Sequence, residues 1–376
     1  MRRVTVVQLL PALASGGVER STLEITEALV RAGHRAIVVS AGGRLLSTLQ
    51  QIGGEHIALD IGRKSPWTLR HVVALRRLFM QERVNIVHAR SRFPAWLGWL
   101  ALCGIERDQR PAFVTTVHGL NSPSRYSAIM AKGDRVICVS GTVRDYVLRH
   151  YPQTDPGKLR VIPRGIDTVA FPRVHHPDAA LREQLASEYP ALAGNGPLLL
   201  MPGRGTRLKG HADALALLAA LRRDDIDARL WMLGTREAGR DRYIADLEQQ
   251  SASLGVAGAL AITPPTAKIA EAYAACDLVL QLSRKPEAFG RTVIEALSVG
   301  RPVVGWAHGG VGELLHELQP QGAVTPLDID ALIVAAKCQL ERAMLAQPPA
   351  PPATMPYTLH AMQDATLAVY DELVSP

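Results

Sequence analysis

The strongest constraint on the fold is a regular alternation of short apolar runs and longer amphipathic stretches. The apolar runs, which predict strands, lie in the first half at residues 4–10, 36–40, 56–59, 85–88, 113–117 and 135–139. In the second half they lie at 198–202, 229–233, 259–262, 277–282 and 302–305. The stretches that predict helices lie between them, at 19–32, 67–83, 93–102, 211–223, 243–254, 266–275 and 291–299. Runs separated by helices in this way indicate βαβ units around parallel sheets, so the sequence predicts an α/β fold.

Two such sheets are expected. A length of 376 residues corresponds to about two domains. A segment rich in His, Pro and Gly interrupts the alternation, and we expect residues 170–197 to form the crossing between two Rossmann-like halves. A Pro-rich stretch at 347–356 precedes a last helical segment at 357–374. Because ligands of open α/β sheets bind at the carboxyl ends of the strands, two halves imply a cleft with a binding site.

The composition excludes several classes of protein. Hydrophobic residues make up 47% of the chain and charged residues 20%, which excludes a disordered, collagen-like or coiled-coil protein. No apolar run reaches about 18 residues, so no transmembrane helix is expected. The four cysteines are far apart and form no C-x-x-C pair, which argues against a zinc site and favours a reducing cytoplasm. Residues 4–10 follow two arginines as in a signal peptide, but polar residues interrupt the run, and we expect an uncleaved first strand.

The net charge of +7 is distributed unevenly. Residues 1–175 hold 25 Lys and Arg against 12 Asp and Glu, whereas the remainder holds 17 against 23. A basic half indicates an anionic partner, although a solvated arginine-rich surface explains the same charge. Within it, arginines surround the predicted helix at 67–83, which also carries Trp67. That pattern is typical of helices on anionic membranes, and equally of a core-facing helix with a basic outer face. The chain has no helix-turn-helix, RNP-like or zinc-finger pattern, so no nucleic-acid partner is expected.

Glycines follow two of the predicted strands. Gly16 and Gly17 come after the first strand and open a helix, and Gly203-Arg204-Gly205 follows the first strand of the second half. Glycine lets backbone N–H groups approach an anion, and a helix N-terminus favours negative charge. Leu208 stands where G-x-G-x-x-G would require a third glycine, which argues against a dinucleotide-dependent dehydrogenase. Ordinary tight turns remain the alternative for either segment taken alone.

Two further groups of residues suit a nucleotide-sugar. Arg204 and Lys209 are close enough in sequence to neutralise one diphosphate. Glu287 and Glu295 are separated by seven residues, the first in the loop after a buried strand and the second early in a helix. Carboxylates accept hydrogen bonds from the vicinal hydroxyls of sugar and ribose rings. A surface loop acid and a favourable acid near a helix N-terminus would explain the same two residues.

Taken together, these segments resemble the family 4 retaining glycosyltransferases of the GT-B fold over nearly the whole chain. The resemblance rests on Gly16-Gly17, Gly203-Arg204 with Lys209-Gly210, the Glu287-to-Glu295 segment followed by Gly300-Arg-Pro-Val-Val, Gly309-Gly310 with Glu313, and Pro163-Arg-Gly-Ile-Asp167. It implies two Rossmann-like domains facing across a cleft. The N-terminal, acceptor-binding domain would be residues 1–170, joined by a C-terminal helix at 357–376 that crosses back to it. The C-terminal, donor-binding domain would be residues 171–356.

The resemblance also implies roles for individual residues. Arg204 and Lys209 would bind the donor diphosphate, with Gly203 beside them, and Glu295 the ribose hydroxyls. Glu287 would hold the donor sugar together with the backbone of Phe289, Gly290 and Arg291. Gly16 and Gly17 would lie near the phosphates and the acceptor. His118 matches a histidine at the donor sugar, although a lone histidine is more often a hydrogen-bonded structural residue. The expected catalytic residues are His118, Glu287, Arg204 and Lys209.

The chain departs from the family pattern in three places. Arg164 stands where the family commonly has Asn, and Thr263-Pro-Pro-Thr266 stands where a glycine-rich turn near the base pocket is common. The segment between residues 328 and 357 looks shortened. The segments His88–Trp96, 116–119 and 163–167 also resemble bacterial glycosyltransferases of lipopolysaccharide core assembly. That resemblance makes Arg90, Arg92 and Arg164 candidate contacts for an acceptor phosphate.

The expected function is therefore transfer of a sugar, with retention, from a nucleotide-diphospho-sugar to a lipid-linked or lipopolysaccharide core saccharide. The donor, expected to be a UDP-sugar, is a co-substrate, and no cofactor or metal is expected, because Asp225-x-Asp227 and Asp328-x-Asp330 are interpreted as surface acids. The expected location is the cytoplasm, with contact to the anionic inner membrane surface as an option. The alternatives are a nucleotide-sugar epimerase of the GT-B type and a two-domain small-ligand binding protein.

Overall fold

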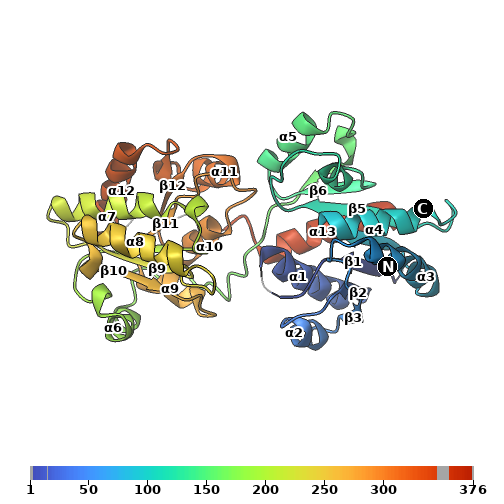
Figure 1. Ribbon diagram of the computed structural model, residues 1–376, viewed down its shortest axis with the longest axis horizontal. Helices are drawn as coiled ribbons and strands as arrows, with labels where there is room; N and C mark the ends of the chain where they lie inside the picture. The colour runs from blue at the N-terminus through green and yellow to red at the C-terminus, as the bar shows by residue number, and fades with distance from the viewer. Residues whose placement is uncertain (1–2, 15, 345–354, 375–376) are drawn as a thin grey trace. The chain divides into compact units, whose positions relative to one another are not determined.

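The computed structural model describes residues 3–14, 16–344 and 355–374, and it divides them into two compact units (Figure 1). The first unit comprises the described residues up to Gly165 together with those from Leu359 onward, and the second comprises Ile166–Thr358. Each unit contains one parallel sheet with helices packed on it. The prediction of an α/β fold with two Rossmann-like halves is confirmed.

The sheet of the first unit has the strand order β3-β2-β1-β4-β5-β6-β7. Its strands are β1 (Thr5–Leu9), β2 (Arg35–Ser40), β3 (Glu55–Ala58), β4 (Ile86–Ala89), β5 (Ala112–Val117), β6 (Arg135–Cys138) and β7 (Leu159–Val161). The α-helices of this unit are α1 (Gly17–Arg31), α2 (Leu46–Gln51), α3 (His71–Gln81), α4 (Arg92–Cys103), α5 (Gly141–His150) and α13 (Leu359–Val374). The central strand β1 pairs in parallel with both β2 and β4, and four of its five residues are buried. Strands covered on both faces read as continuous apolar runs, which is why the sequence located them.

The sheet of the second unit has the strand order β10-β9-β8-β11-β12-β13. Its strands are β8 (Leu198–Pro202), β9 (Arg229–Leu233), β10 (Leu260–Thr263), β11 (Leu278–Gln281), β12 (Val303–Trp306) and β13 (Ala323–Val324). Its α-helices are α6 (Ala179–Glu188), α7 (His211–Arg223), α8 (Asp241–Ser253), α9 (Ile269–Ala275), α10 (Arg291–Val299), α11 (Gly309–Leu318) and α12 (Ile329–Met344). The chain order reverses between β8 and β11, so the loops after these two strands flank the switch point where such sheets bind ligands.

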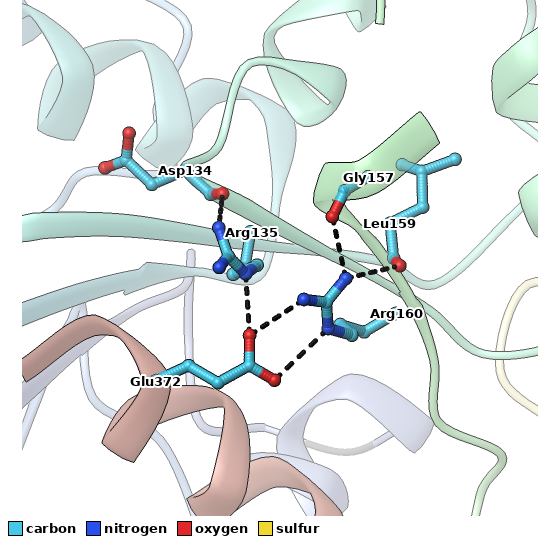
Figure 2. A network of polar contacts seen from close by, with 6 residues as sticks. All are labelled: Asp134, Arg135, Gly157, Leu159, Arg160 and Glu372. Atoms are coloured by element: carbon cyan, nitrogen blue, oxygen red, sulfur yellow. Dashed lines mark hydrogen bonds and ion pairs between the residues drawn. The ribbon is translucent and has the colours of Figure 1, made fainter. Parts of the chain in front are cut away.

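The last helix, α13, returns to the first unit, as the GT-B resemblance implied (Figure 1). It packs on α1, and Met362, Val369 and Tyr370 enter the same apolar cluster as Ile25 of α1. Near its end, Glu372 accepts hydrogen bonds from Arg135 on β6 and Arg160 on β7 (Figure 2). The carboxylate thus ties α13 to the two strands at one edge of the sheet.

The structure places the boundary between the two units earlier in the chain than the sequence predicted. The two units meet in the chain at Gly165 and Ile166, whereas residues 170–197 lie within the second unit and include α6, which packs on α9. No residue of α6 is buried, and its only large apolar side chains are Leu181 and Leu185, so the apolar pattern that would predict a helix is weak. The predicted helix at 67–83 is divided into a 3₁₀ turn, Pro66–Arg70, and α3. Most of the Pro-rich stretch at 347–356 lies outside the described residues.

Within the described ranges, the structure contains no helix that is both long and apolar enough to cross a membrane.

Candidate active site

The candidate residues form two clusters, one in each unit. In the second unit the loops after β8 and β11 bring Lys209 and Glu287 together, with Lys209 Nζ 2.6 Å from Glu287 Oε1. Gln281, the last residue of β11, donates from Nε2 to Glu287 Oε2 at 3.2 Å, and the Ser283 hydroxyl donates to Oε1. Both carboxylate oxygens are therefore held in place. Both side chains of the ion pair keep about a quarter of their surface accessible.

The surroundings of Glu287 favour its ionised state. Burial alone would raise the pKa of Glu287, but the charge of Lys209 and the hydrogen bonds from Lys209, Ser283 and Gln281 outweigh it. The pKa of Glu287 consequently lies below its usual range. At neutral pH the site presents an ammonium and a carboxylate side by side.

Two glycines allow these loops to approach so closely. Gly210, which precedes α7, has φ +82°, and a Cβ at this position would lie 2.1 Å from the carbonyl oxygen of Leu282. Gly309, which opens α11, has φ +60°, and its Cβ would lie 2.5 Å from the carbonyl oxygen of Glu287. The next residue, Gly310, donates its N–H to that same carbonyl at 2.8 Å. The Glu287 loop is therefore pinned through its backbone as well as through its side chain.

Helix α10 begins beside this loop. Gly290 precedes its first residue, Arg291, and Phe289 is buried just before it. Glu295 is buried on α10, where it accepts a hydrogen bond from the Tyr273 hydroxyl of α9 at 3.1 Å. A helix N-terminus next to Lys209 and Glu287 adds backbone donors that favour an anion.

Other predicted donor-site residues lie nearby in the fold. Gly203 follows β8 directly, and Arg204 after it is exposed. The Thr263-Pro-Pro-Thr266 segment lines a cavity of about 280 Å³, whose walls include Tyr189 and Trp231. That this cavity is the base pocket that the resemblance implied stays a prediction.

In the first unit, Gly16 and Gly17 begin α1, and both are exposed. The residue before α1, Gly16, has φ +143°, and no side chain caps the helix. A helix N-terminus leaves its first N–H groups without partners inside the helix, which is the feature that suits this position to an anion.

His118 follows β5 and belongs to a buried polar network. Its Nδ1 accepts a hydrogen bond from the Arg164 guanidinium, which also donates to the Ser21 hydroxyl of α1. Arg90, at the end of β4, donates to Gln8 Oε1 at 2.7 Å and to Ser21 Oγ at 3.2 Å. Burial, followed by electrostatic interactions with Arg164, Arg90 and His88, lowers the pKa of His118 well below its usual range. Among the described residues, its Nε2 atom has no hydrogen-bond partner.

This network changes the interpretation of two arginines. Arg90 is 3% exposed and Arg164 is 8% exposed, so neither presents its guanidinium on the surface as a phosphate contact requires. Of the three candidates, Arg92 is the more accessible, and its guanidinium lies over the ring of Tyr126. The sequence could not distinguish these positions, because all three arginines follow strands.

One aspartate of each D-x-D segment, Asp227 and Asp328, has a structural partner. Asp227 pairs with Arg222 and Arg229 at 2.8 and 2.9 Å. The Asp328 carboxylate accepts the N–H of Ala331 in the first turn of α12.

Sequence reasoning missed several members of both clusters. Ser283 and Gln281 lie in or beside the segment that carried the resemblance, and their proximity to Glu287 in sequence is a usable signal. Ser21 and Tyr273 reach the site from other helices, and nothing in the local sequence marks them. Tyr370 of α13 contacts His88 at 2.6 Å across 282 positions of the chain. Such long-range contacts emerge only from the fold.

Both halves of the chain match known protein families, and solved structures share the fold. The model for Glycosyltransferase Family 4 matches residues 15–170, and the model for Glycosyl transferases group 1 matches residues 185–340. A solved glycosyltransferase from Rickettsia africae is 27% identical, with a TM-score of 0.88 and full coverage of both chains. The Anabaena protein Alr3699/HepE, solved in complex with UDP and glucose, is 20% identical, with a TM-score of 0.80 over 98% of this chain and 100% of its own.

Among curated proteins, the D-inositol 3-phosphate glycosyltransferase of Xylanimonas cellulosilytica is 31% identical over 253 residues. That match covers 60% of this chain, which spans only 56% of the relative's length. The two parallel-sheet, Rossmann-like units match the GT-B class of glycosyltransferase folds. Residues 15–170 belong to the Glycosyltransferase Family 4 domain family and residues 185–340 to the Glycosyl transferases group 1 domain family, so both halves of the chain are glycosyltransferase domains.

Proposed function

We propose that the protein is a retaining glycosyltransferase that moves a sugar from a nucleotide-diphospho-sugar, expected to be a UDP-sugar, to a saccharide hydroxyl. The observation that carries the proposal is the Lys209–Glu287 ion pair at the carboxyl ends of β8 and β11. It joins a cation suited to a diphosphate with a carboxylate suited to sugar hydroxyls. Family membership supports the same activity.

In the proposed reaction, the bond between the anomeric carbon and the diphosphate breaks while the acceptor oxygen attaches to that carbon on the same face. Charge develops on the leaving diphosphate. Lys209, Arg204 and the N-terminus of α10 stabilise it, and the leaving phosphate takes the acceptor proton. Glu287 and Glu295 orient the sugar and ribose through their hydroxyls. Preorganised groups of this kind often supply the largest part of catalysis, and the loss of one donor typically costs about 2.7–4 kcal/mol.

For the acceptor we propose a phosphorylated or lipid-linked saccharide of the lipopolysaccharide core type. The name of the curated relative, a D-inositol 3-phosphate glycosyltransferase, supports a phosphorylated acceptor. On Pro66–Arg70 and α3 of the first unit, Trp67 is 80% exposed, Leu69 51% and Val73 50%. The same segment, residues 63–83, also carries exposed basic residues: Arg63, Lys64, Arg70, Arg77 and Arg83. Exposed apolar and basic side chains in one segment support docking on the anionic inner leaflet of the membrane, in the cytoplasm.

A thermal-shift screen of nucleotide sugars tests the donor assignment. A ligand that binds only the folded state raises apparent stability with the logarithm of its concentration over Kd. We expect one nucleoside-diphospho-sugar to raise the melting temperature of the wild type, and a smaller shift in Glu287→Gln. A protein that no nucleotide sugar stabilises would not be a transferase of this kind.

The alternatives give different results with that donor. An epimerase consumes it without an acceptor, whereas the proposed transferase releases nucleoside diphosphate only when an acceptor is present. A binding protein releases none. Since Asp227 serves ion pairs and Asp328 a helix end, we expect neither D-x-D segment to hold a metal, and a chelator should leave the rate unchanged.

A further inference from the structure

Arg164 determines how His118 can behave. The guanidinium lies against His118 Nδ1 on one side and the Ser21 hydroxyl on the other. A guanidinium carries only donors and stays protonated at any physiological pH. The His118 Nδ1 atom must therefore present a lone pair, and the ring proton must sit on Nε2.

The surroundings also exclude a doubly protonated ring. The charged and titratable groups around His118 are Arg164, after β7, Arg90, at the end of β4, and His88, on β4. His88 is itself held neutral by burial and by the two arginines, which lower its pKa well below the usual range. A proton on His118 Nδ1 would place a third positive charge beside two buried guanidiniums and set a donor against a donor.

We propose that Arg164 is a positioning residue that locks His118 in the neutral Nε2–H form, so that His118 donates a hydrogen bond to a substrate oxygen and takes no proton. The substrate part of this inference rests on the proposed function. Nε2 is the atom left without a partner among the described residues, and it is shielded from solvent. A buried donor without an acceptor is unfavourable, so a substrate oxygen that reaches it is favoured.

With its Nδ1 lone pair engaged by Arg164, His118 cannot act as the base for the acceptor proton. In the proposed reaction the acceptor O–H bond breaks as its oxygen bonds to the anomeric carbon. The electron pair of the broken sugar–phosphate bond moves onto the leaving phosphate, which takes the proton. His118 then contributes orientation and polarisation only.

Histidine nitrogen NMR on the full chain tests the lock without any substrate. The His118 signal, assigned by its loss in His118→Gln, should show a protonated Nε2 and a bare Nδ1 from about pH 5.5 to about 8. In Arg164→Met both neutral tautomers of His118, Nδ1–H and Nε2–H, should appear, and the ring should take up a proton at higher pH than in the wild type. Arg164→Lys keeps a hydrogen-bond donor at this position and should preserve the wild-type signal. Arg160→Met is the matched control, because Arg160 lies in the same unit but pairs with Glu372. A proton on Nδ1 in the wild type, or no change in Arg164→Met, would overturn the proposal.

Kinetics separately test whether His118 acts as a hydrogen-bond donor to the substrate. A glutamine amide nitrogen reaches the position of Nε2, whereas an asparagine amide nitrogen reaches only that of Nδ1. We expect His118→Gln to keep kcat within about tenfold of the wild type and His118→Asn to lose at least about a hundredfold. The wild-type kcat should show no inflection from His118 between about pH 5.5 and about 8. Equal losses in both variants, or such an inflection, would contradict a donor role. Absence of any transferase activity would refute the proposed function and leave the NMR result to decide the lock.

Discussion

Replacement of Lys209 by alanine separates the catalytic role of the donor site from its structural role. Lys209 donates to Glu287 at 2.6 Å, but Glu287 also accepts hydrogen bonds from Ser283 and Gln281, so the carboxylate keeps two partners in the variant. An ion pair with about a quarter of each side chain exposed contributes at most about 1 kcal/mol to stability. For a domain of this size that corresponds to a melting shift of roughly 2–4 °C.

The expected effect on turnover is much larger. Loss of one preorganised charge at a developing oxyanion costs about 2.7–4 kcal/mol, or roughly a hundredfold to a thousandfold in kcat. The assay compares acceptor-dependent release of nucleoside diphosphate with melting curves for the wild type, Lys209→Ala and Lys337→Ala. The last is the control, since Lys337 forms a surface ion pair with Asp224 in the same unit. Near-normal turnover in Lys209→Ala, or a loss matched by unfolding, would refute the reasoning.

Three further predictions concern other parts of the chain. Gly210→Ala should destabilise the second unit by about 1–3 kcal/mol in denaturant unfolding, because alanine is strained at φ +82° and its Cβ would meet Leu282; unchanged stability would contradict the geometry. Hydrogen bonds from Arg160 and then Arg135 lower the pKa of Glu372, so its carboxylate stabilises the fold above pH 4.5 and loses that effect as the pH falls through its folded-state pKa. The free energy of unfolding of Glu372→Gln should therefore be lower than that of the wild type at neutral pH and converge with it in acid. A difference that stays constant with pH would argue against the ion pairs. Trp67→Ala should weaken sedimentation with anionic vesicles and leave the rate on a soluble acceptor unchanged; equal binding by both proteins would exclude this membrane surface.

Much of the fold was predictable because parallel strands covered on both faces carry their own signal. The strands around β1 and β8 matched apolar runs to within a residue or two. The edge strands β7 and β13 have three and two residues, too few to show a period. Helix α6 buries no residue, and its sequence has few large apolar residues, so the pattern predicts it as part of a connecting segment.

The candidate site was predictable as a set of residues but not as a geometry. The resemblance named Lys209 and Glu287, yet only the fold shows that they pair across 78 positions. For Arg164, the role that the sequence predicted differs from the one that the structure indicates. The sequence marked it as a departure from the family and a phosphate contact, whereas in the structure it is buried against His118. Such a role depends on tertiary neighbours that no local pattern encodes.

The proposed reaction transfers a sugar with retention of configuration at the anomeric carbon. Proton and carbon NMR of a reaction with a nucleotide sugar labelled with ¹³C at the anomeric carbon tests it most directly, since one spectrum follows that carbon from donor to product. Retaining transfer predicts a new glycosidic signal of the same anomeric configuration as the donor, which appears only with acceptor and is absent in Lys209→Ala. An inverted product, an epimerised donor formed without acceptor, or labelled free sugar alone would contradict it.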